Sequence, residues 1–503
     1  MIVDLNRNDK TPLYQQLKRR IGTMIAERSL LPGSKLPATR ELAISLGVSR
    51  NTVVQAYQEL EVEGLISSGV GRGSFVSLYP PTGTTGGESK TQNWMSYEGL
   101  FSSSWIRLNK DLVSVFEKLA RPHPDNSFID MASDQPNPGL LPIAEFGECL
   151  HSAVRRYGRS LFATGSAYGF EPLLEYLPTL LARRNVTCRP ENLMVVNGLQ
   201  QALSLIGRLF IDPGDMVMLQ HLTYPGAVGV FRSLQANCIG ITMDGDGLCI
   251  DVLKRILRYR KPKLLYIVPT FHNPTGTTLA PERRSQLVEL CRDSELVIVE
   301  DDYAHDLTFG GIEAMPLKSR DTTGGIIHVG SFSESLFPGI RLSWIVAAKP
   351  IIERLGLLKH SSDLYTNRIV QGALLEFCRK GYYDKEIKRK RQVYARRCDL
   401  LAEAMSRYFP REVTWRKPKG GIYQWVDIPD SVDAVALLLR TRERGVVFTP
   451  GRMFAVEEWC RAGFRLGFTA PEEQQLPEGV RIIGDTLRVF LGSTEQEVCH
   501  GKV

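Results

Sequence analysis

Short apolar segments recur through the larger, later part of the chain, and stretches with helical periodicity separate them. Alternation of such strands with helices is typical of an α/β domain whose sheet is largely parallel. Ligands of these sheets bind beyond the carboxyl ends of the strands, so polar motifs at those ends are candidate binding residues. The predicted strands are Leu193–Val196, Met216–Leu219, Leu264–Val268, Leu296–Val299, Ile326–Val329 and Ser343–Ala347.

One of these motifs follows the apolar segment Ile326–Val329. Gly330 and a hydroxyl-rich turn, Ser331 to Ser333, come next, followed by Glu334, a Pro-Gly pair and Arg341. Hydroxyl groups, free backbone N–H groups and one guanidinium are groups that bind anions. The stretch therefore predicts an anion site at the end of a strand.

The first 78 residues predict a separate small domain of three helices and a hairpin. Each helix begins near a capping hydroxyl, and a glycine-rich turn from Gly69 to Gly73 joins the two strands. The capping residues are Thr11, Thr39 and Ser49, the second and third helices are 40–46 and 50–63, and the strands are 65–66 and 74–76. This order predicts a winged helix-turn-helix, an α domain with a small β wing.

The segment from Pro12 to Val76 resembles the GntR family of bacterial DNA-binding domains. The resemblance rests on PLYQQL, PGSKLPATRELA, LGVSRNTVVQAYQELEVEGLI and GRGSFV. Side chains at the start of the third helix can reach the major groove, and backbone N–H groups there can meet phosphates. An arginine in the wing can reach the DNA backbone or the minor groove. The predicted DNA-binding residues are Arg40, Ser49, Arg50, Asn51, Thr52 and Arg72, although any single arginine could instead be a solvated surface charge.

The chain length and composition indicate several domains of an ordinary water-soluble protein. A chain of 503 residues is too long for one core, and residues 79–125 begin with the linker-like PPTGTTGGES before several aromatic residues. We expect domains at 1–78 and 126–503 joined by this linker, whose aromatic part either docks on a neighbour or begins the next domain. A net charge of +7 permits an anionic partner.

The cysteines and apolar runs bear on the compartment. Nine cysteines are scattered without C-x-x-C pairs or metal-ligand spacing, so we expect reduced thiols in a cytoplasm and no metal site. We find no apolar run long enough to span a bilayer, so no membrane partner is expected.

Residues 126–503 resemble the class I aminotransferases of pyridoxal-phosphate fold-type I. The resemblance rests on NGLQQ at 197–201, TYPG at 223–226, HNPTG at 272–276, EDDY at 300–303, GSFSESLFPGIR at 330–341 and FRLGF at 464–468. It implies an α/β domain with a smaller α+β C-terminal subdomain, usually a homodimer. Together with the DNA-binding segment, the arrangement is similar to that of MocR-type (GabR-like) transcriptional regulators.

The resemblance also implies a role for each motif residue in a cofactor pocket. Gly198, Leu199, Ser331, Ser333 and Arg341 would surround the phosphate; Tyr224 would stack on the pyridine ring; Asn273 and Tyr303 would bond its phenolic oxygen; Asp301 would pair with its nitrogen; Arg465 would bind the carboxylate of an effector. Leu199 stands where the family usually has a small hydroxyl residue, and Gln220, His221 and Leu222 replace its acidic residue and proline. In isolation, each motif could be a turn, a cap or a surface ion pair.

Glu334 stands where the family has the lysine that forms the Schiff base. A carboxylate cannot form that imine, so the sequence predicts no catalytic residue and a pseudo-aminotransferase that is not an enzyme. Pyridoxal 5'-phosphate or pyridoxamine 5'-phosphate would bind non-covalently, and the negative charge of Glu334 would favour the amine.

The sequence therefore favours a DNA-binding transcriptional regulator with an aminotransferase-like domain. Its partners would be a double-stranded DNA operator, a pyridoxal-type or amino-acid-type effector and a second copy of the chain. One alternative is an active aminotransferase with an appended DNA-binding domain. Another is a ligand-free regulator that uses the large domain only for assembly.

Overall fold

The computed structural model describes residues 11–26, 30, 34–69, 73–77, 128–310, 315–457 and 463–500. The chain divides into two compact units, Met1–Tyr97 and Glu98–Val503. Arg72 and the predicted linker, residues 79–125, lie outside the described residues, so the linker stays a prediction. Within the described ranges, no helix is both long and apolar enough to cross a membrane.

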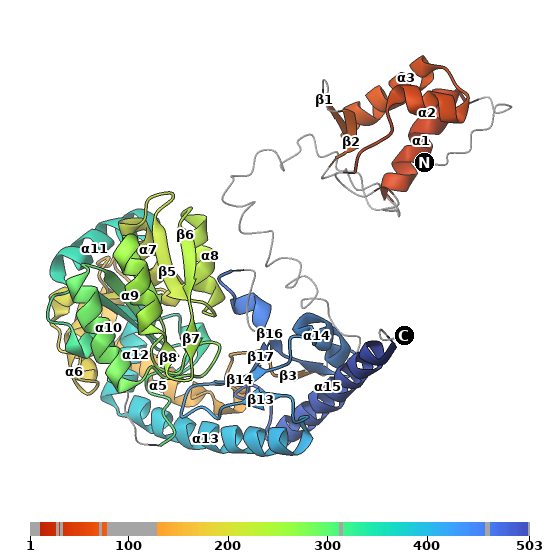
Figure 1. Cartoon of the computed structure of the whole chain (residues 1–503). Coiled ribbons are helices and arrows are strands. Elements are labelled where there is room, and N and C mark those ends of the chain that lie inside the picture. Colours follow the sequence, from red (N-terminus) through yellow and green to blue (C-terminus); the bar gives the residue numbers. More distant parts are fainter. Residues whose placement is uncertain are drawn as a thin grey trace. The chain divides into compact units, whose positions relative to one another are not determined.

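The first unit contains three helices and a two-stranded antiparallel hairpin (Figure 1). The elements are α1 (Leu13–Ala26), α2 (Thr39–Leu46), α3 (Arg50–Val62), β1 (Ile66–Gly69) and β2 (Gly73–Val76). Apolar side chains from all three helices and both strands form one core, because the helices carry them at helical spacing. The winged helix-turn-helix prediction is confirmed.

The ends of α2 and α3 show how this unit is built locally. Ser49 caps α3, since its side chain accepts a hydrogen bond from the Thr52 backbone N–H at 3.1 Å. The prediction that Thr39 caps α2 is wrong, because Ala38 occupies the cap position and Thr39 is already helical. Gly47 ends α2 at a φ of 62°, a conformation that costs glycine little.

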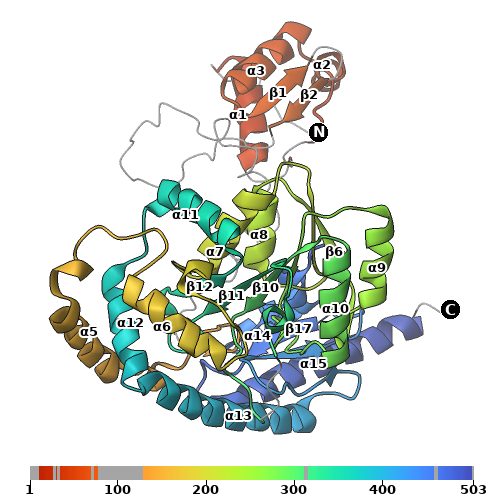
Figure 2. The same ribbon diagram turned by 90° about the vertical axis from the view of Figure 1, so that its left-hand side faces the viewer.

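The second unit is organised around a seven-stranded sheet of order β4-β12-β11-β10-β9-β5-β6, of which β12, β11 and β10 can be followed in Figure 2. β12 is antiparallel to both neighbours, and the other pairs are parallel. The strands are β4 (Leu193–Val196), β5 (Met216–Gln220), β6 (Asn237–Ile241), β9 (Leu264–Ile267), β10 (Val297–Asp302), β11 (Ile326–Ser331) and β12 (Ser343–Val346). The α/β sheet predicted from the alternation of apolar strands and helices is therefore confirmed.

Helices cover both faces of this sheet. One face packs against α7 (Leu199–Phe210), α8 (Pro225–Ser233) and α11 (Lys349–Asp363). The other face packs against α5 (Ile143–Tyr157), α6 (Glu171–Ala182), α9 (Ile250–Tyr259), α10 (Pro281–Asp293) and α12 (Arg368–Arg379). Because side chains alternate along a strand, neighbouring residues of β10 contact opposite layers.

A smaller α+β subdomain follows, as the predicted fold class requires. It contains a four-stranded sheet of order β13-β14-β17-β16 and a short parallel pair between β3 and β15. The strands are β3 (Ile129–Asp130), β13 (Thr414–Trp415), β14 (Tyr423–Asp427), β15 (Val446–Val447), β16 (Thr449–Pro450) and β17 (Gly463–Gly467), and the helices are α13 (Tyr382–Tyr408), α14 (Ala434–Arg442) and α15 (Gln475–His500). A small hairpin, β7 (Met243–Asp244) and β8 (Gly247–Leu248), lies before α9.

Candidate functional site

A cavity of about 800 Å³ lies beyond the carboxyl ends of the large sheet's strands. Tyr224, Asn273 and Arg465, three of the predicted site residues, line it together with Gln200 and Asp134. Tyr224 follows β5, Asn273 follows β9 and Arg465 belongs to β17 of the small subdomain. The fold therefore brings residues more than two hundred positions apart to one hollow.

Asp301, near the end of β10, is fully buried and hydrogen-bonded. Its Oδ2 accepts a bond from the Tyr266 hydroxyl at 2.5 Å, whereas its Oδ1 has no partner among the described residues. Burial raises the pKa of Asp301 to about 8; the bond from Tyr266 acts in the opposite direction, and the charge of Glu334 raises the pKa further. The carboxyl group is thus suited to a cationic N–H donor.

Asn273, Arg465 and Tyr303 already have partners. Arg465 donates from one nitrogen to Asn273 Oδ1 at 2.9 Å and from the other to the backbone carbonyl of Ala132 at 3.0 Å. Its guanidinium carbon lies 3.9 Å from the ring centre of Tyr423. The Tyr303 hydroxyl donates to the carbonyl of Phe271 at 2.8 Å. To bond a ligand's carboxylate, as predicted, Arg465 must share or release these bonds.

The predicted phosphate residues meet at the start of α7. Gly198 precedes this helix with a φ of 84°, and a Cβ there would lie 2.3 Å from the nearest Arg341 guanidinium nitrogen. Arg341 therefore lies directly against the positive end of the helix dipole, where an anion would offset both charges. Leu199 is partly buried against the main core, and its side chain offers no polar atom.

Ser331 and Ser333 lie at the same edge. Ser331 pairs with Ser343 of β12, which in turn pairs with Val196 of β4, just before Gly198. The Ser331 hydroxyl accepts a bond from the Ser333 N–H at 3.1 Å. The Ser333 hydroxyl is buried and has no partner among the described residues, so it is available to an anion.

Glu334 continues this turn into the site. Its side chain is partly buried, and its shielded Oε2 has no hydrogen-bond partner among the described residues. Burial raises the pKa of Glu334; hydrogen bonding from Ser331 opposes the rise, and the nearby charge of Asp134 adds to it. Glu334 is thus close enough to interact with two other carboxyl groups, Asp301 and Asp134.

Sequence reasoning missed several residues that support the site. Tyr266 lies within the predicted apolar strand Leu264–Val268 and carries no motif, and Asp134 lies in no motif either. Lys359 is fully buried and donates to Asp363 at 2.7 and 2.8 Å, while Asn197 donates to the same carboxylate at 2.6 Å. This cluster holds the start of α7, and the i, i+4 spacing of Lys359 and Asp363 on one helix was the available signal.

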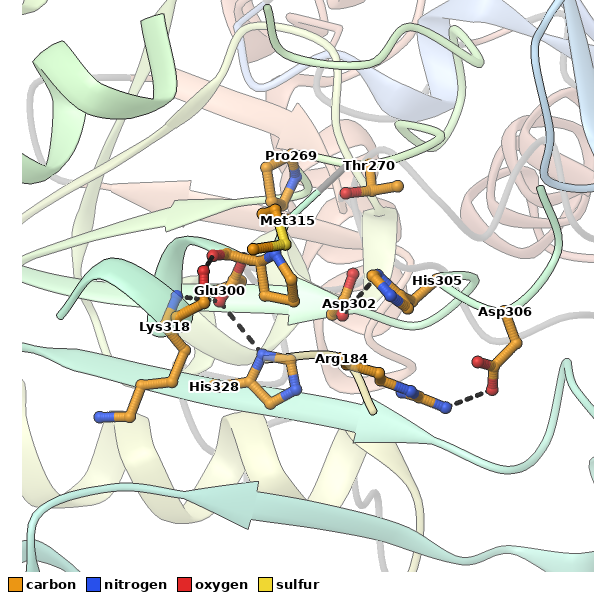
Figure 3. Close-up of polar contacts among 12 residues, drawn as sticks. Arg184, Pro269, Thr270, Glu300, Asp302, His305, Asp306, Met315, Lys318 and His328 are labelled. Atoms are coloured by element: carbon orange, nitrogen blue, oxygen red, sulfur yellow. Dashed lines mark hydrogen bonds and ion pairs between the residues drawn. The ribbon is translucent and has the colours of Figure 1, made fainter. Parts of the chain in front are cut away.

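The opposite face of β10 holds a second polar network (Figure 3). Glu300 accepts bonds from the backbone N–H groups of Leu317 at 2.5 Å and Lys318 at 2.9 Å, and its Oε2 lies 3.1 Å from the His328 ring. Asp302 lies 3.3 Å from the His305 ring. These contacts fix the strand that presents Asp301 to the other face.

In the first unit, the predicted DNA-binding residues lie on α2 and at the start of α3. Arg40, Arg50 and Asn51 are exposed, Thr52 is partly buried, and the Ser49 side chain serves as the helix cap. The exposed side chains at an uncovered helix start fit contact with a DNA groove, which stays a prediction.

Comparison with known proteins extends these observations to whole domains. The family described as Aminotransferase class I and II matches residues 153–483, and the bacterial regulatory proteins of the gntR family match residues 13–76. Aromatic-amino-acid aminotransferase 1 of Thermococcus litoralis is 31% identical over 400 residues, which are 78% of this chain and 95% of that protein. The HTH-type transcriptional regulator TauR of Rhodobacter capsulatus is 30% identical over 483 residues, 95% of this chain and 96% of that protein.

A solved structure gives the same picture. The kynurenine aminotransferase of Pyrococcus horikoshii, crystallised with PMP and kynurenine, superposes with a TM-score of 0.74 at 32% identity, covering 78% of this chain and 97% of that one. The prediction that the chain is not an enzyme is wrong, because relatives and structural neighbours along the large domain are named as aminotransferases. The single residue Glu334 was too narrow a basis for it.

Proposed function

Since the chain belongs to the family of class I and II aminotransferases and carries a regulatory domain of the GntR family, we propose that it is a DNA-binding transcription regulator whose large domain binds a pyridoxamine-type ligand. The fold implies dependence on pyridoxal phosphate. The proposal adds that binding is non-covalent and that the amine form is preferred. The observation that carries it is Glu334, placed beside Asp301 and Ser331.

The residues present fit a phosphorylated pyridine. Arg341, the start of α7 and the free hydroxyl of Ser333 would hold a phosphate. The free Oδ1 of Asp301 would accept a hydrogen bond from a protonated ring nitrogen, and this positive charge would return the pKa of Asp301 toward its ordinary value. When bound, such a ring supplies an electron-withdrawing centre; the protein supplies orientation and charge.

Glu334 distinguishes the two ligand forms by charge. An ammonium group at about 4 Å from a carboxylate gains about 4 kcal/mol at an effective dielectric constant of 20, whereas an aldehyde gains no such term. Burial makes ionisation of Glu334 unfavourable in the protein alone, and a cationic amine would reverse this. Even a third of that energy gives a tenfold preference.

Calorimetry on the full chain tests this proposal. Pyridoxamine phosphate should bind at least tenfold more tightly than pyridoxal phosphate, and Glu334→Gln should abolish the preference. Arg341→Gln is the matched control, since it should weaken both ligands alike and keep the preference. Equal affinities in the unaltered chain, or a preference that survives Glu334→Gln, would refute the proposal.

For the DNA-binding unit, we propose contact with an operator through the exposed residues of α2 and α3. A homodimer of the large domain would present two such units, so the operator would contain two half-sites. A ligand could change operator binding only through different affinities for two conformations of the dimer. Gel-shift titration with and without pyridoxamine phosphate tests this step, and an unchanged affinity would contradict it.

A second candidate function, favoured by the named relatives, is aminotransferase activity in the same chain. Its test is the half-reaction: a 2-oxo acid added to protein loaded with pyridoxamine phosphate. Appearance of the pyridoxal absorbance together with the amino acid product would establish it, and an unchanged spectrum over hours would exclude it.

A further inference from the structure

A second cavity, of about 810 Å³, lies apart from the cofactor site and shares no lining residue with it. Its walls come from the end of α6, the segment after β10 and the first half of α13. These elements belong to one unit of the chain, so their arrangement does not depend on the DNA-binding unit. The cavity is as large as the cofactor cavity and therefore has room for a small organic molecule.

The charges around this cavity are unequal. Four cationic side chains line it, against two carboxylates. Arg183 is paired with Asp384 at 2.9 Å, and Arg184 is paired with Asp306. The remaining cations are Lys388 and Arg391.

Lys388 and Arg391 are the two lining cations that no carboxylate neutralises in the described part of the chain. Arg391 uses its Nε to bond the backbone carbonyl of Asp306, which leaves its terminal nitrogens. Within the described residues, neither side chain forms an ion pair. They lie three positions apart on α13, one turn of the helix, and hence point to the same side. The two can therefore bind one anionic group between them.

The rest of the lining is apolar in part. Leu180 and Ile387 are buried beside the cavity, and Phe309 is partly buried at its edge. Apolar walls beside a pair of free cations fit a molecule that joins an anionic group to an apolar body, because burying the body adds binding energy of about 25 cal/mol per Å². An inorganic ion alone would leave these walls unused.

The cavity also contacts the strand of the cofactor site. His305 lines the cavity and lies 3.3 Å from Asp302, the neighbour of Asp301 on β10 (Figure 3). Arg184 and Asp306 form the pair drawn beside them. Asp301 and Asp302 face opposite sides of the sheet, so His305 connects the second cavity to the face of β10 opposite Asp301.

We propose that this cavity is a second ligand site, for a small carboxylate or phosphate on an apolar body, with Lys388 and Arg391 binding the anionic group. The proposal does not depend on the ligand of the cofactor site. The second cavity lies on the side of β10 opposite Asp301, so a ligand bound there could act on the strand that carries Asp301.

The test uses the full-length chain, with phenylacetate and phenyl phosphate as probes and phenylacetamide as the neutral counterpart. Calorimetry should show binding of at least one anion and at least tenfold weaker binding of the amide. The double variant Lys388→Gln/Arg391→Gln should weaken the anion at least tenfold. The control, Lys385→Gln, removes one positive charge from an exposed position of α13 outside the lining and should change nothing.

Three results would overturn the proposal: no binding of either anion, binding of the amide as tight as that of the anions, or an equal loss in the Lys385 control. Competition supplies a further check. Excess pyridoxamine phosphate should leave probe binding in place, and displacement of the probe would assign it to the cofactor cavity instead. Because this experiment measures the probes themselves, it can succeed where the proposed cofactor binding fails, and the reverse.

Discussion

Removing the Tyr266 hydroxyl should destabilise the large unit by an amount that depends on pH. The hydroxyl donates to Asp301 at 2.5 Å, and both side chains are fully buried. A bond to a charged group contributes about 1.5–3 kcal/mol, and a bond between neutral groups about 0.5–1.5 kcal/mol. Which value applies to Tyr266→Phe depends on the charge of Asp301.

The sign follows from the pKa of Asp301, which burial raises to about 8. Below that pH the folded state holds the proton, so the lost bond is neutral; above it the lost bond is charged. The decrease in unfolding free energy should therefore grow from about 1 kcal/mol at pH 6 to about 2–3 kcal/mol at pH 9. The unaltered protein should itself lose stability as pH rises from about 4 to about 8, since its folded state binds the extra proton.

Tryptophan fluorescence during urea unfolding measures this change, because the first tryptophan is Trp94 and the DNA-binding helices contain none. Tyr303→Phe is the matched control. It removes an equally buried hydroxyl whose acceptor, the Phe271 carbonyl, does not titrate, so its penalty should not vary with pH. A penalty for Tyr266→Phe that is the same at pH 6 and pH 9, or that grows equally in the control, would refute the reasoning.

Two further predictions concern the cofactor site and the DNA-binding unit. Gly198→Ala should lower the affinity for pyridoxamine phosphate at least tenfold, because the new Cβ would lie 2.3 Å from an Arg341 nitrogen and must displace that side chain. Calorimetry measures the affinity. The control is Gly214→Ala, which is also at positive φ but has open space around it. Arg50→Ala should weaken operator binding and, if Arg50 contacts a phosphate, reduce the slope of log affinity against log salt by about 1. Gel shifts at several salt concentrations measure this slope. The control is Arg159→Ala, at an exposed position of the other unit.

The sequence was most informative where a motif follows an apolar strand. Tyr224, Asn273 and Asp301 could be placed at one sheet edge, because the carboxyl ends of parallel strands coincide. The contact between Arg465 and Asn273 joins residues 192 positions apart, and no local pattern encodes it. Buried partners such as Tyr266 resemble ordinary strand residues until the neighbouring strand is known.

Glu334 shows a different limit. The sequence showed that a glutamate occupies this position, but it did not show the groups around it. For example, a buried lysine of α13 donates a hydrogen bond to the turn that carries Glu334. The conclusion drawn from Glu334 alone therefore concerned one group in a site whose other charges were still unknown. The named aminotransferase relatives corrected that conclusion.

The lysine beneath this turn, Lys390, gives a prediction that separates two opposing energies. It is fully buried and donates to the carbonyl of Leu336, two residues after Glu334. Burial lowers its pKa to about 8, and the charges of Glu386 and, more weakly, Glu334 act in the opposite direction. At pH 7, Lys390→Met would remove a burial penalty of up to about 3 kcal/mol but leave the carbonyl without its donor, at about 1–3 kcal/mol, so the net change should be small.

The pH dependence of stability should nevertheless differ clearly. Between pH 8 and about 10.5 the unfolded chain holds a proton that the folded Lys390 has lost, so the unfolding free energy of the unaltered protein gains up to about 3 kcal/mol relative to Lys390→Met. Urea unfolding at pH 7.5 and pH 10 measures this difference, with exposed Lys385→Met as the control for general charge effects. A difference between protein and variant that stays constant over this range would mean that Lys390 remains charged in the folded state. Its charge would then have to be balanced in place, and the acidic groups that act on it are Glu386, one turn earlier on α13, and Glu334 in the turn it supports.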